Sequence, residues 1–463
     1  MIWFCMAFIG RTFCSNLLLK QSFATCLLIW LGAVSVTLGS PPDEDRTNQR
    51  TSRSSSIRVY RSAHFRLHTD LSEPDARSML VDMESTLDKV ATYWRQPVSG
   101  IIDAYIIDDL ANWSSRDHLN PMTQLMLQHI GGVTIPIPTP KKREPFRQRA
   151  LMYAISRPDV VRHEVVHAYC CQTFGYSGPD WYKEGMADTI CMLPDKQGSV
   201  RCPQEVLDSL QSENVPSVND IIHGPSFTDP LFETIKRAAS LVDGNEQSVV
   251  AALPSAWGSA EDEMLRKAKQ SYAHSWALCH FLLLNKNYNK RFRQLGHSFL
   301  QNAKLTFDQV FSNDRDQLEF EFQLFLQNIA QGYQVGLCRW QWDKPFIVLE
   351  PGNHIAILIQ AAAGYQPTGC TVEQGGTYSF HTEGTWQISP QGKQLNADGN
   401  HHGDGQLAGV ILSDYRVTEN LLLGQSSHFI SKGPGQLHVR CQDRWSEIAD
   451  NAGFVRLTIK REK

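Results

Sequence analysis

The hydrophobic positions in the first third of the chain change their period several times. Residues 59–71 (VYRSAHFRLHTDL) alternate between apolar and polar side chains, as a half-buried strand does. Residues 72–94 have helical spacing, and residues 100–109 (GIIDAYIIDD) form a second apolar strand. Residues 133–139 (VTIPIPT) carry two prolines, which an edge strand tolerates. This order predicts an α+β fold.

The middle of the chain is helical in pattern. Residues 144–175 are mostly helical, with Pro158 in the first turn of a helix that runs to Phe174 and stops at Gly175. Further helices are expected between residues 200 and 335. The clearest are residues 202–211, 229–242, 271–284 and 316–333.

The pattern changes near Leu337. From Pro345 onward, short alternating segments are separated by Gly, Asn, Asp and Pro, which indicates a β-sandwich. The best strands are residues 355–361, 377–384, 385–390, 407–413, 436–442 and 454–460. We therefore expect an α+β domain over residues 58–336, followed by an all-β sandwich domain over residues 345–463.

The N-terminal 57 residues have a different pattern. Residues 24–39 (ATCLLIWLGAVSVTLG) form a short apolar run with Arg11 and Lys20 upstream and small residues before a break. This predicts a secretory signal over residues 1–40, since a membrane span needs about 20 apolar residues. An uncleaved N-terminal anchor is the alternative. Residues 41–57 are polar and predict a linker, so we expect a secreted, periplasmic or cell-surface protein.

Composition and cysteine count agree with export. Among 463 residues, 42% are hydrophobic and 20% charged, as in folded proteins. The formal charge of -4 provides no basic surplus for a nucleic-acid partner. Eight of the eleven cysteines follow the leader, which permits disulfides. Cys191 with Cys202 and Cys370 with Cys441 are the pairings we expect; the alternative is buried free thiols, which we prefer for Cys279.

The motif HEVVH, residues 163–167, falls inside the helix predicted from Pro158. At 3.6 residues per turn, His163 and His167 project from one face and can bind one zinc ion. Glu164 lies beside them and can take a proton from a water molecule whose pKa the metal lowers. The alternative is a surface helix that carries two histidines.

A second acidic segment follows directly. PDWYKEGMAD, residues 179–188, carries Glu184 and Asp188 one helical turn apart. A catalytic zinc takes three protein ligands and an open position, and Glu184 is a suitable third ligand. Asp188 could accept the second ring N–H of His163 and fix its tautomer. Both acids could instead be solvated helix residues.

The paired motifs, HExxH and Trp-x-x-Glu-Gly-x-Ala-Asp, resemble those of the gluzincin metallopeptidases, and more narrowly the bacterial peptidase-MA-like group. The resemblance spans roughly residues 60–334. It implies a zincin fold, one zinc ion held by His163, His167 and Glu184, Glu164 as general base, and Asp188 as the acid behind a ligand. It also implies that the strand at residues 133–139 lines the cleft and binds peptide by β-augmentation.

A peptidase also needs a donor for the oxyanion of its tetrahedral intermediate. SYAHSW, residues 271–276, supplies Tyr272 and His274 as candidates. In similar proteins a Tyr on this helix precedes an apolar run, which favours Tyr272. The alternative is packing, because Tyr272, Trp276 and Cys279 have core-facing helical spacing.

Within the segment from Gly375 to Lys460, four motifs follow one another in order: GQLAGVIL (405–412), LLLGQSSHFI (421–430), GPGQLHVRCQD (433–443) and DNAGFVRLTI (450–459). Together they resemble the galactose-binding-type sandwich of small bacterial lectins. The resemblance implies that Asp443, Asp450 and Asn451 help to hold Ca²⁺ and sugar, in keeping with the oxygen ligands that calcium prefers. Cys441 and Gln442 replace the usual polar pair there, and Arg444 and Trp445 crowd the loop. The alternative is an accessory sandwich that only packs against or positions the enzyme.

The sequence therefore predicts an exported zinc peptidase that acts on peptide or protein substrates, with carbohydrate as a possible second partner of the sandwich. One alternative is a non-catalytic cell-surface or carbohydrate-binding protein on a zincin scaffold. The intact HEVVH motif and Glu184 argue against it. A structural or anchored envelope protein is the third reading, and it would have neither zinc nor activity.

Overall fold

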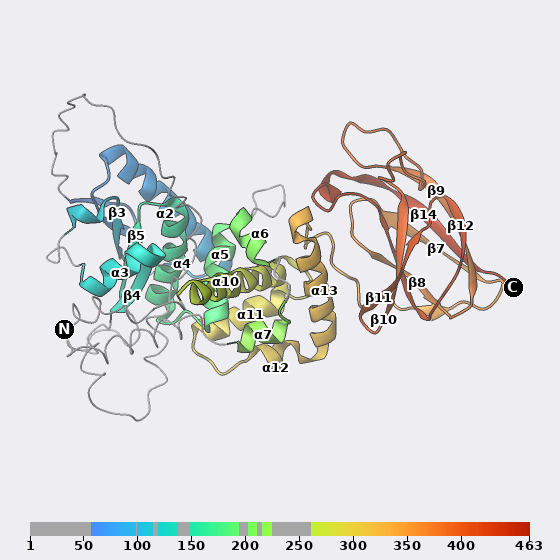
Figure 1. Cartoon of the computed structure of the whole chain (residues 1–463), viewed down its shortest axis with the longest axis horizontal. Coiled ribbons are helices and arrows are strands. Elements are labelled where there is room, and N and C mark those ends of the chain that lie inside the picture. The colour runs from blue at the N-terminus through green and yellow to red at the C-terminus, as the bar shows by residue number, and fades with distance from the viewer. Residues whose placement is uncertain are drawn as a thin grey trace. The chain divides into compact units, whose positions relative to one another are not determined.

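The computed structural model describes residues 57–98, 100–113, 119–137, 149–193, 202–210, 215–224 and 261–463. Figure 1 shows a mixed α+β chain with several sheets. It divides into two compact units. Among the described residues, the first contains those within Met1–Cys191, Gln204–His280 and Arg293–Thr306, and the second contains those within Met192–Pro203, Phe281–Phe292 and Phe307–Lys463. The domain boundary expected between residues 336 and 345 falls inside the second unit.

A five-stranded sheet organises the first unit. Its order is β1-β2-β3-β5-β4, and β2, β3 and β5 run parallel while β1 and β4 are antiparallel. The strand expected at residues 133–139 is β4, which contains Pro136 and lies at an edge of the sheet among the described strands, as expected. The strands are β1 (Arg58–Arg61), β2 (Phe65–Thr69), β3 (Ile102–Ile107), β4 (Gly132–Ile137) and β5 (Arg149–Ile155).

Two expectations for this unit are wrong. Residues 59–71 are not one strand but the antiparallel pair β1 and β2, with a turn closed by the bond from Ser62 N to Phe65 O, at 3.0 Å. Residues 149–155 are strand β5 and not helix. Most of β5 is buried, and a continuous apolar run has no period that separates a buried strand from a helix.

Helices cover both faces of this sheet. Thr134 on β4 faces helix α4, where it contacts Glu164. The alternate residues of β3, β4 and β5 therefore face the opposite side. They form a hydrophobic cluster there, which includes Tyr105, Val133 and Tyr153. The helices of this unit are α2 (Glu73–Trp94), α3 (Pro121–Ile130), α4 (Pro158–Phe174), α5 (Asp180–Cys191), α6 (Gln204–Leu210) and α7 (Val218–His223), and α10 (Glu261–Leu284) and α11 (Asn289–Leu300) belong to it in part.

The second unit contains two sheets that are antiparallel except for the parallel pair β6 and β8, and this arrangement agrees with the expected β-rich C-terminal part. Their orders are β11-β10-β13-β8-β6 and β12-β9-β14-β7, and their inner faces share one hydrophobic core. Two strands were expected at residues 377–384 and 385–390, but the structure has one strand, β9, which ends at Gln387. The elements are α12 (Phe307–Phe311), α13 (Arg315–Asn328), β6 (Ile347–Val348), β7 (His354–Gln360), β8 (Gln366–Val372), β9 (Thr377–Gln387), β10 (Leu407–Ser413), β11 (Arg416–Leu422), β12 (Ser426–Ile430), β13 (Gly435–Cys441) and β14 (Ala452–Arg461).

The expected disulfides are wrong. All eight cysteines that the structure describes are free thiols. Cys370 lies on β8 and Cys441 on β13, but Val439 already pairs with Gln366, so the two cysteines are several residues apart along the strands. That separation exceeds the roughly 7 Å between Cα atoms that a disulfide can bridge.

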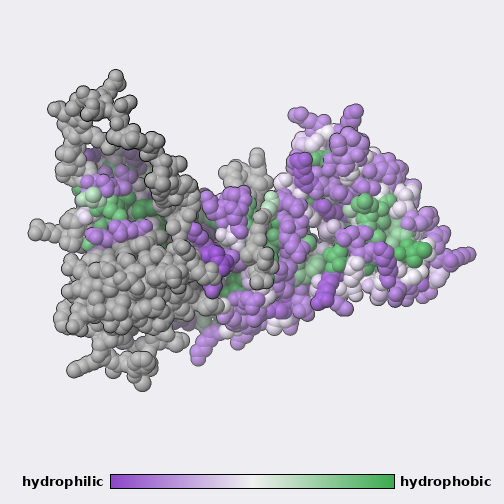
Figure 2. Space-filling view, viewed as in Figure 1, coloured by the Kyte–Doolittle hydropathy of each residue, from purple (hydrophilic) through white to green (hydrophobic). Residues whose placement is uncertain are grey.

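Some expectations concern residues outside the described ranges. These are the leader and most of the linker, residues 1–56, and the helix at residues 229–242. Within the described ranges no helix has the length and apolar character of a membrane span. Figure 2 shows hydrophobic side chains among hydrophilic ones on the visible face of the sandwich, and the exposed large hydrophobic residues of this unit include Leu358, Leu422 and Phe454.

A buried carboxylate connects α13 to the outer face of the sandwich. Trp340, Val410 and Leu412 form a small hydrophobic cluster against which Phe320 and Leu324 of α13 pack. Glu321, on the same helix, is buried within this junction. Its two oxygens accept hydrogen bonds at 2.7–3.1 Å from Asn285 Nδ2, Asn287 Nδ2, Tyr288 Oη, Trp340 N and Trp342 Nε1.

Replacing Glu321 with Ala should destabilise the second unit by about 3 kcal/mol or more. The substitution leaves five buried donors without their acceptor, and each unsatisfied donor costs roughly 1–3 kcal/mol before relaxation. Chemical denaturation followed by Trp fluorescence measures the change. Glu319→Ala on the same helix is the control and should stay within about 0.5 kcal/mol of wild type. Equal effects of the two substitutions would contradict the role assigned to Glu321.

Candidate metal centre

Two histidines of α4 face each other one helical turn apart. Pro158 opens this helix and Gly175, with φ of 75°, ends it, so His163 and His167 lie in its central turns. Both side chains are buried, and their Nε2 atoms are 2.9 Å apart. Two imidazole nitrogens therefore point into the same small volume.

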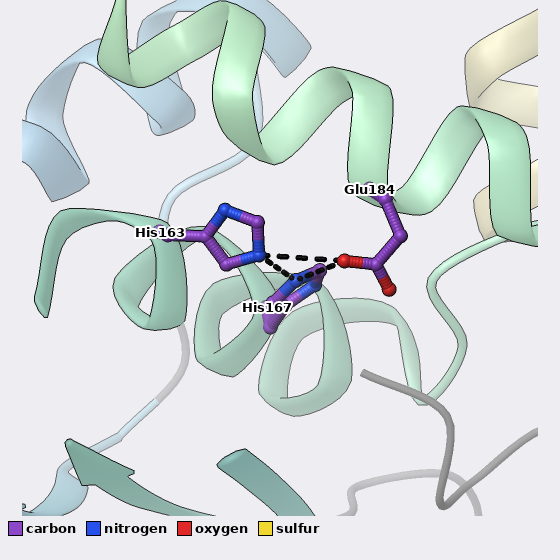
Figure 3. Close-up of side chains that lie close together, drawn as sticks. All are labelled: His163, His167 and Glu184. Carbon is purple, nitrogen blue, oxygen red and sulfur yellow. Dashed lines mark hydrogen bonds and ion pairs between the residues drawn. The ribbon is translucent and has the colours of Figure 1, made fainter. Parts of the chain in front are cut away.

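Glu184 reaches this volume from the next helix, α5. Its Oε2 atom lies 3.3 Å from His163 Nε2 and 3.4 Å from His167 Nε2. One potential ligand atom from each of the three residues lies within 4.8 Å of the others. Figure 3 shows the three side chains converging from the two helices.

Glu184 is fully buried, and neighbouring nitrogen groups keep it ionised. Burial by itself raises the pKa of this carboxyl, but the imidazole of His167 and the ammonium of Lys183 hold the pKa well below its ordinary value. Lys183 is only 5% exposed; its Nζ lies 3.3 Å from Glu184 Oε1 and 2.9 Å from Asp180 Oδ1. An unpaired carboxylate in this position would be strongly unfavourable.

The three side chains fit a divalent metal ion. Neither oxygen of Glu184 has a partner with hydrogen-bond geometry among the described residues, although three nitrogens lie within 3.4 Å. Between two imidazole nitrogens only one proton can be shared. Burial lowers the pKa of His167 to about 4, which leaves its ring neutral and able to ligate. Two neutral imidazoles and one carboxylate are a donor set that zinc binds.

Asp188 orients the first histidine. Its Oδ1 atom lies 2.7 Å from His163 Nδ1, which is the contact expected from the sequence. Burial disfavours the charged imidazole, but the charge of Asp188 raises the pKa of His163 well above its ordinary value, so a metal ion would have to displace the proton on Nε2. The proton that remains on Nδ1 is held by Asp188, and the Nε2 lone pair then faces Glu184 and His167.

Glu164 is held by the edge strand β4. Thr134 Oγ1 donates a hydrogen bond of 2.7 Å to Glu164 Oε2, and the whole Glu164 side chain is buried. Gly132 on the same strand lies so close that a Cβ atom there would be 2.8 Å from both Cγ and Oε1 of Glu164. The strand expected to line the cleft therefore contacts the expected general base.

A glycine permits the close packing of α5 on α10. A Cβ atom on Gly185 would lie 2.4 Å from the backbone oxygen of Ser275 and 2.7 Å from Cys279 Sγ. Because Gly185 follows Glu184 directly, this packing also fixes the position of the carboxylate.

The two candidate oxyanion donors are buried. Tyr272 packs in the hydrophobic cluster that contains Val133 and Tyr153, in keeping with the packing alternative. Burial lowers the pKa of His274 to about 4, and its Nε2 has no hydrogen-bond partner among the described residues. A catalytic role for Tyr272 stays a prediction.

The three C-terminal candidates for calcium or sugar binding differ in their burial. Asp443 and Asn451 are buried, whereas Asp450 is exposed. Asp443 Oδ1 accepts a bond from the backbone N–H of Arg444 at 2.7 Å. The guanidinium of Arg440 lies 3.8 Å from the ring centroid of Trp445 and so places a positive charge next to this loop. Calcium binding there stays a prediction.

Sequence reasoning missed two residues of the site. Lys183 has the pattern of a solvated helix residue, and nothing in the sequence indicates that its ammonium is buried against Glu184. Thr134 was expected only as part of a strand that lines the cleft. The alternation on β4 could have pointed to it, since Gly132 and Thr134 share the face that β4 turns to α4.

No family model and no curated protein matches this chain. Among solved structures, it is similar to a protein described as "EclA N-terminal domain; PllA-like lectin", with 20% identity and a TM-score of 0.20 over 24% of this chain and 98% of that chain. It is also similar to the IMPa metallopeptidase from Pseudomonas aeruginosa, with 13% identity and a TM-score of 0.16 over 81% of this chain and 35% of that chain. The chain thus spans about a third of the IMPa length. Likenesses at these TM-scores carry no argument about activity.

Replacing Gly185 with Ala should weaken both the fold and metal binding. The added methyl group meets backbone and sulfur atoms that cannot move freely, so we expect a loss of about 1–3 kcal/mol in unfolding free energy and a lower zinc affinity. Denaturant titration and competition with a zinc chelator measure the two effects. Gly433→Ala is the control, because no atom lies within 4 Å of the added Cβ. Wild-type stability and affinity in Gly185→Ala would contradict the close-packing argument.

Proposed function

We propose that this chain is an exported zinc-dependent peptidase with a zincin-like first unit, in which Glu164 is the general base. The observation that carries the proposal is the convergence of His163, His167 and Glu184 in one buried volume, with ligand atoms within 4.8 Å. Glu164 follows His163 directly and is also fully buried.

The ligand set favours a catalytic site over a structural one. Three protein ligands leave a position open for water and substrate, whereas structural zinc sites are closed by four. When bound, zinc supplies Lewis acidity that lowers the pKa of a water molecule and polarises a scissile carbonyl group. Asp188 keeps His163 in the tautomer that ligates through Nε2, and Lys183 keeps Glu184 anionic.

Proton transfer belongs to Glu164. Its carboxylate accepts a proton from the attacking water and later donates it to the departing amine, so the residue returns to its starting state. The hydrogen bond from Thr134 to Oε2 fixes the orientation of this carboxylate. Strand β4 is one edge of the sheet among the described strands, and an extended peptide could pair with it by β-augmentation. The substrate we propose is therefore an extended peptide or protein segment.

Elemental analysis of the purified chain should find about one zinc ion per molecule. A His163→Ala, His167→Ala double variant should contain none, because it loses two of the three ligands. Circular dichroism should show that the variant keeps its helices. A wild-type chain that remains free of zinc after repletion would contradict the metal assignment.

Glu164→Gln should keep its zinc and lose hydrolysis of a quenched peptide library by about 100-fold or more, since the amide cannot accept the proton. Glu205→Gln, on the exposed side of α6, is the matched control and should hydrolyse the library at the wild-type rate. Unchanged activity in Glu164→Gln would exclude this residue as the base. A zinc-loaded wild type without any peptidase activity would favour the non-catalytic alternative.

A further inference from the structure

A cavity of about 400 Å³ lies in the second unit, and none of its lining residues belongs to the candidate metal centre. It is bounded by α13, by the segment that follows Trp340, and by the outer faces of β8, β10 and β13. Its volume falls in the range of sites that bind small molecules. None of its lining residues belongs to the loop at residues 441–451, where calcium and sugar were expected.

Aromatic rings form one part of the lining. Trp342 and Tyr415 meet edge to face with centroids 5.7 Å apart, and Phe346 also lines the cavity. Trp342 is fixed in place, because its Nε1 donates a bond of 2.7 Å to Glu321 and its ring stacks on Trp340. The cavity therefore presents apolar ring surfaces that are ordered before any ligand binds.

Uncharged polar groups form the other part of the cavity lining. Amide side chains come from Gln317, Gln341 and Gln436, and hydroxyl groups come from Thr371 and Ser413. The lining also contains one lysine and one aspartate, whose formal charges cancel. Such a lining supplies many hydrogen-bond donors and acceptors but no net charge to attract an ion.

His438 provides a buried polar group without a partner. It lies on β13, lines the cavity and is 1% exposed, and neither ring nitrogen has a hydrogen-bond partner among the described residues. Burial lowers its pKa to about 3, so the ring is neutral and offers one donor and one acceptor. Because buried polar groups are nearly always hydrogen-bonded, a ligand hydroxyl group is the expected partner.

The turn that carries Tyr415 has an unusual backbone. Asp414 and Tyr415 connect β10 to β11 with φ angles of 47° and 56°. Two-residue hairpin turns of this kind normally contain Asn and Gly, since other residues are strained there. Tyr415 is 40% exposed at the rim of the cavity. Burial of its ring in the core therefore does not account for the strained backbone at this position.

We propose that this cavity binds a neutral saccharide without a metal ion. The apolar faces of a sugar ring fit against Trp342 and Tyr415, while its hydroxyl groups match the surrounding amides and the ring nitrogens of His438. The ligand could be a free sugar or a glycan attached to a protein, because both present the same chemistry. The site is independent of the proposed peptidase activity.

Binding of neutral saccharides to the full chain tests the proposal. A panel of neutral mono- and oligosaccharides, together with glycopeptides that carry the same glycans, is titrated in the presence of EDTA. Two variants probe the cavity. Tyr415→Asn removes the ring but suits the left-handed backbone, and His438→Phe keeps a ring but removes both nitrogens. Phe454→Asn, an exposed aromatic residue outside the cavity lining, is the control.

We expect at least one saccharide to bind in EDTA and both variants to bind it at least tenfold more weakly, while Phe454→Asn binds as wild type. The thermal midpoint of His438→Phe should not fall, because two unpartnered nitrogens are removed. If the midpoint does fall, the proposal is judged by saccharide binding to Tyr415→Asn. Equal binding of free and peptide-linked glycans indicates recognition of the sugar itself, and tighter binding of glycopeptides indicates a protein-linked source. Absence of binding by wild type, unchanged binding by Tyr415→Asn, or binding that EDTA abolishes would overturn the proposal.

Discussion

The burial of the Glu184 carboxylate is the constraint on which the first unit depends. A charge in this position is stable only with compensating groups, and the chain supplies Lys183 on one oxygen and two imidazoles on the other. These partners come from two helices, so α4 and α5 must cross where their side chains meet. Gly185 allows α5 to approach α10 closely at the same point. Helix packing and the metal centre are therefore two consequences of one arrangement.

The same arrangement assigns separate tasks to neighbouring acids. Asp188 contacts the far nitrogen of His163, whereas Glu184 faces the near nitrogens of both histidines. Glu164, the residue after His163, contacts Thr134 and Gly132 of the edge strand. A base held beside an edge strand would lie close to any peptide that extends the sheet. This proximity connects the proposed chemistry to the architecture of the first unit.

The second unit contains another buried carboxylate, whose oxygens are satisfied by hydrogen-bond donors. Glu321 accepts five hydrogen bonds and thereby fixes the segment that contains Trp340 and Trp342 against the sandwich. One consequence is that the outer face of a sheet is partly covered, and the uncovered remainder forms the cavity beside His438. The residues that stabilise this junction also order the proposed sugar-binding surface. The two carboxylates differ in that the Glu321 oxygens accept five hydrogen bonds, whereas neither oxygen of Glu184 has a partner with hydrogen-bond geometry among the described residues.

The sequence alone predicted that His163, His167 and Glu184 come together, along with most of the described elements, because HEVVH and the Glu184 segment depend on helical spacing that local sequence encodes. Alternation likewise predicted the sandwich strands and, through its prolines, the edge strand β4. Only the tertiary structure decided that residues 149–155 are a strand, since a run buried on both faces has no diagnostic period. It also decided that Cys370 and Cys441 stay apart, that Lys183 is buried against Glu184, and that Thr134 holds Glu164. These features depend on contacts between segments distant in sequence, which no local pattern records.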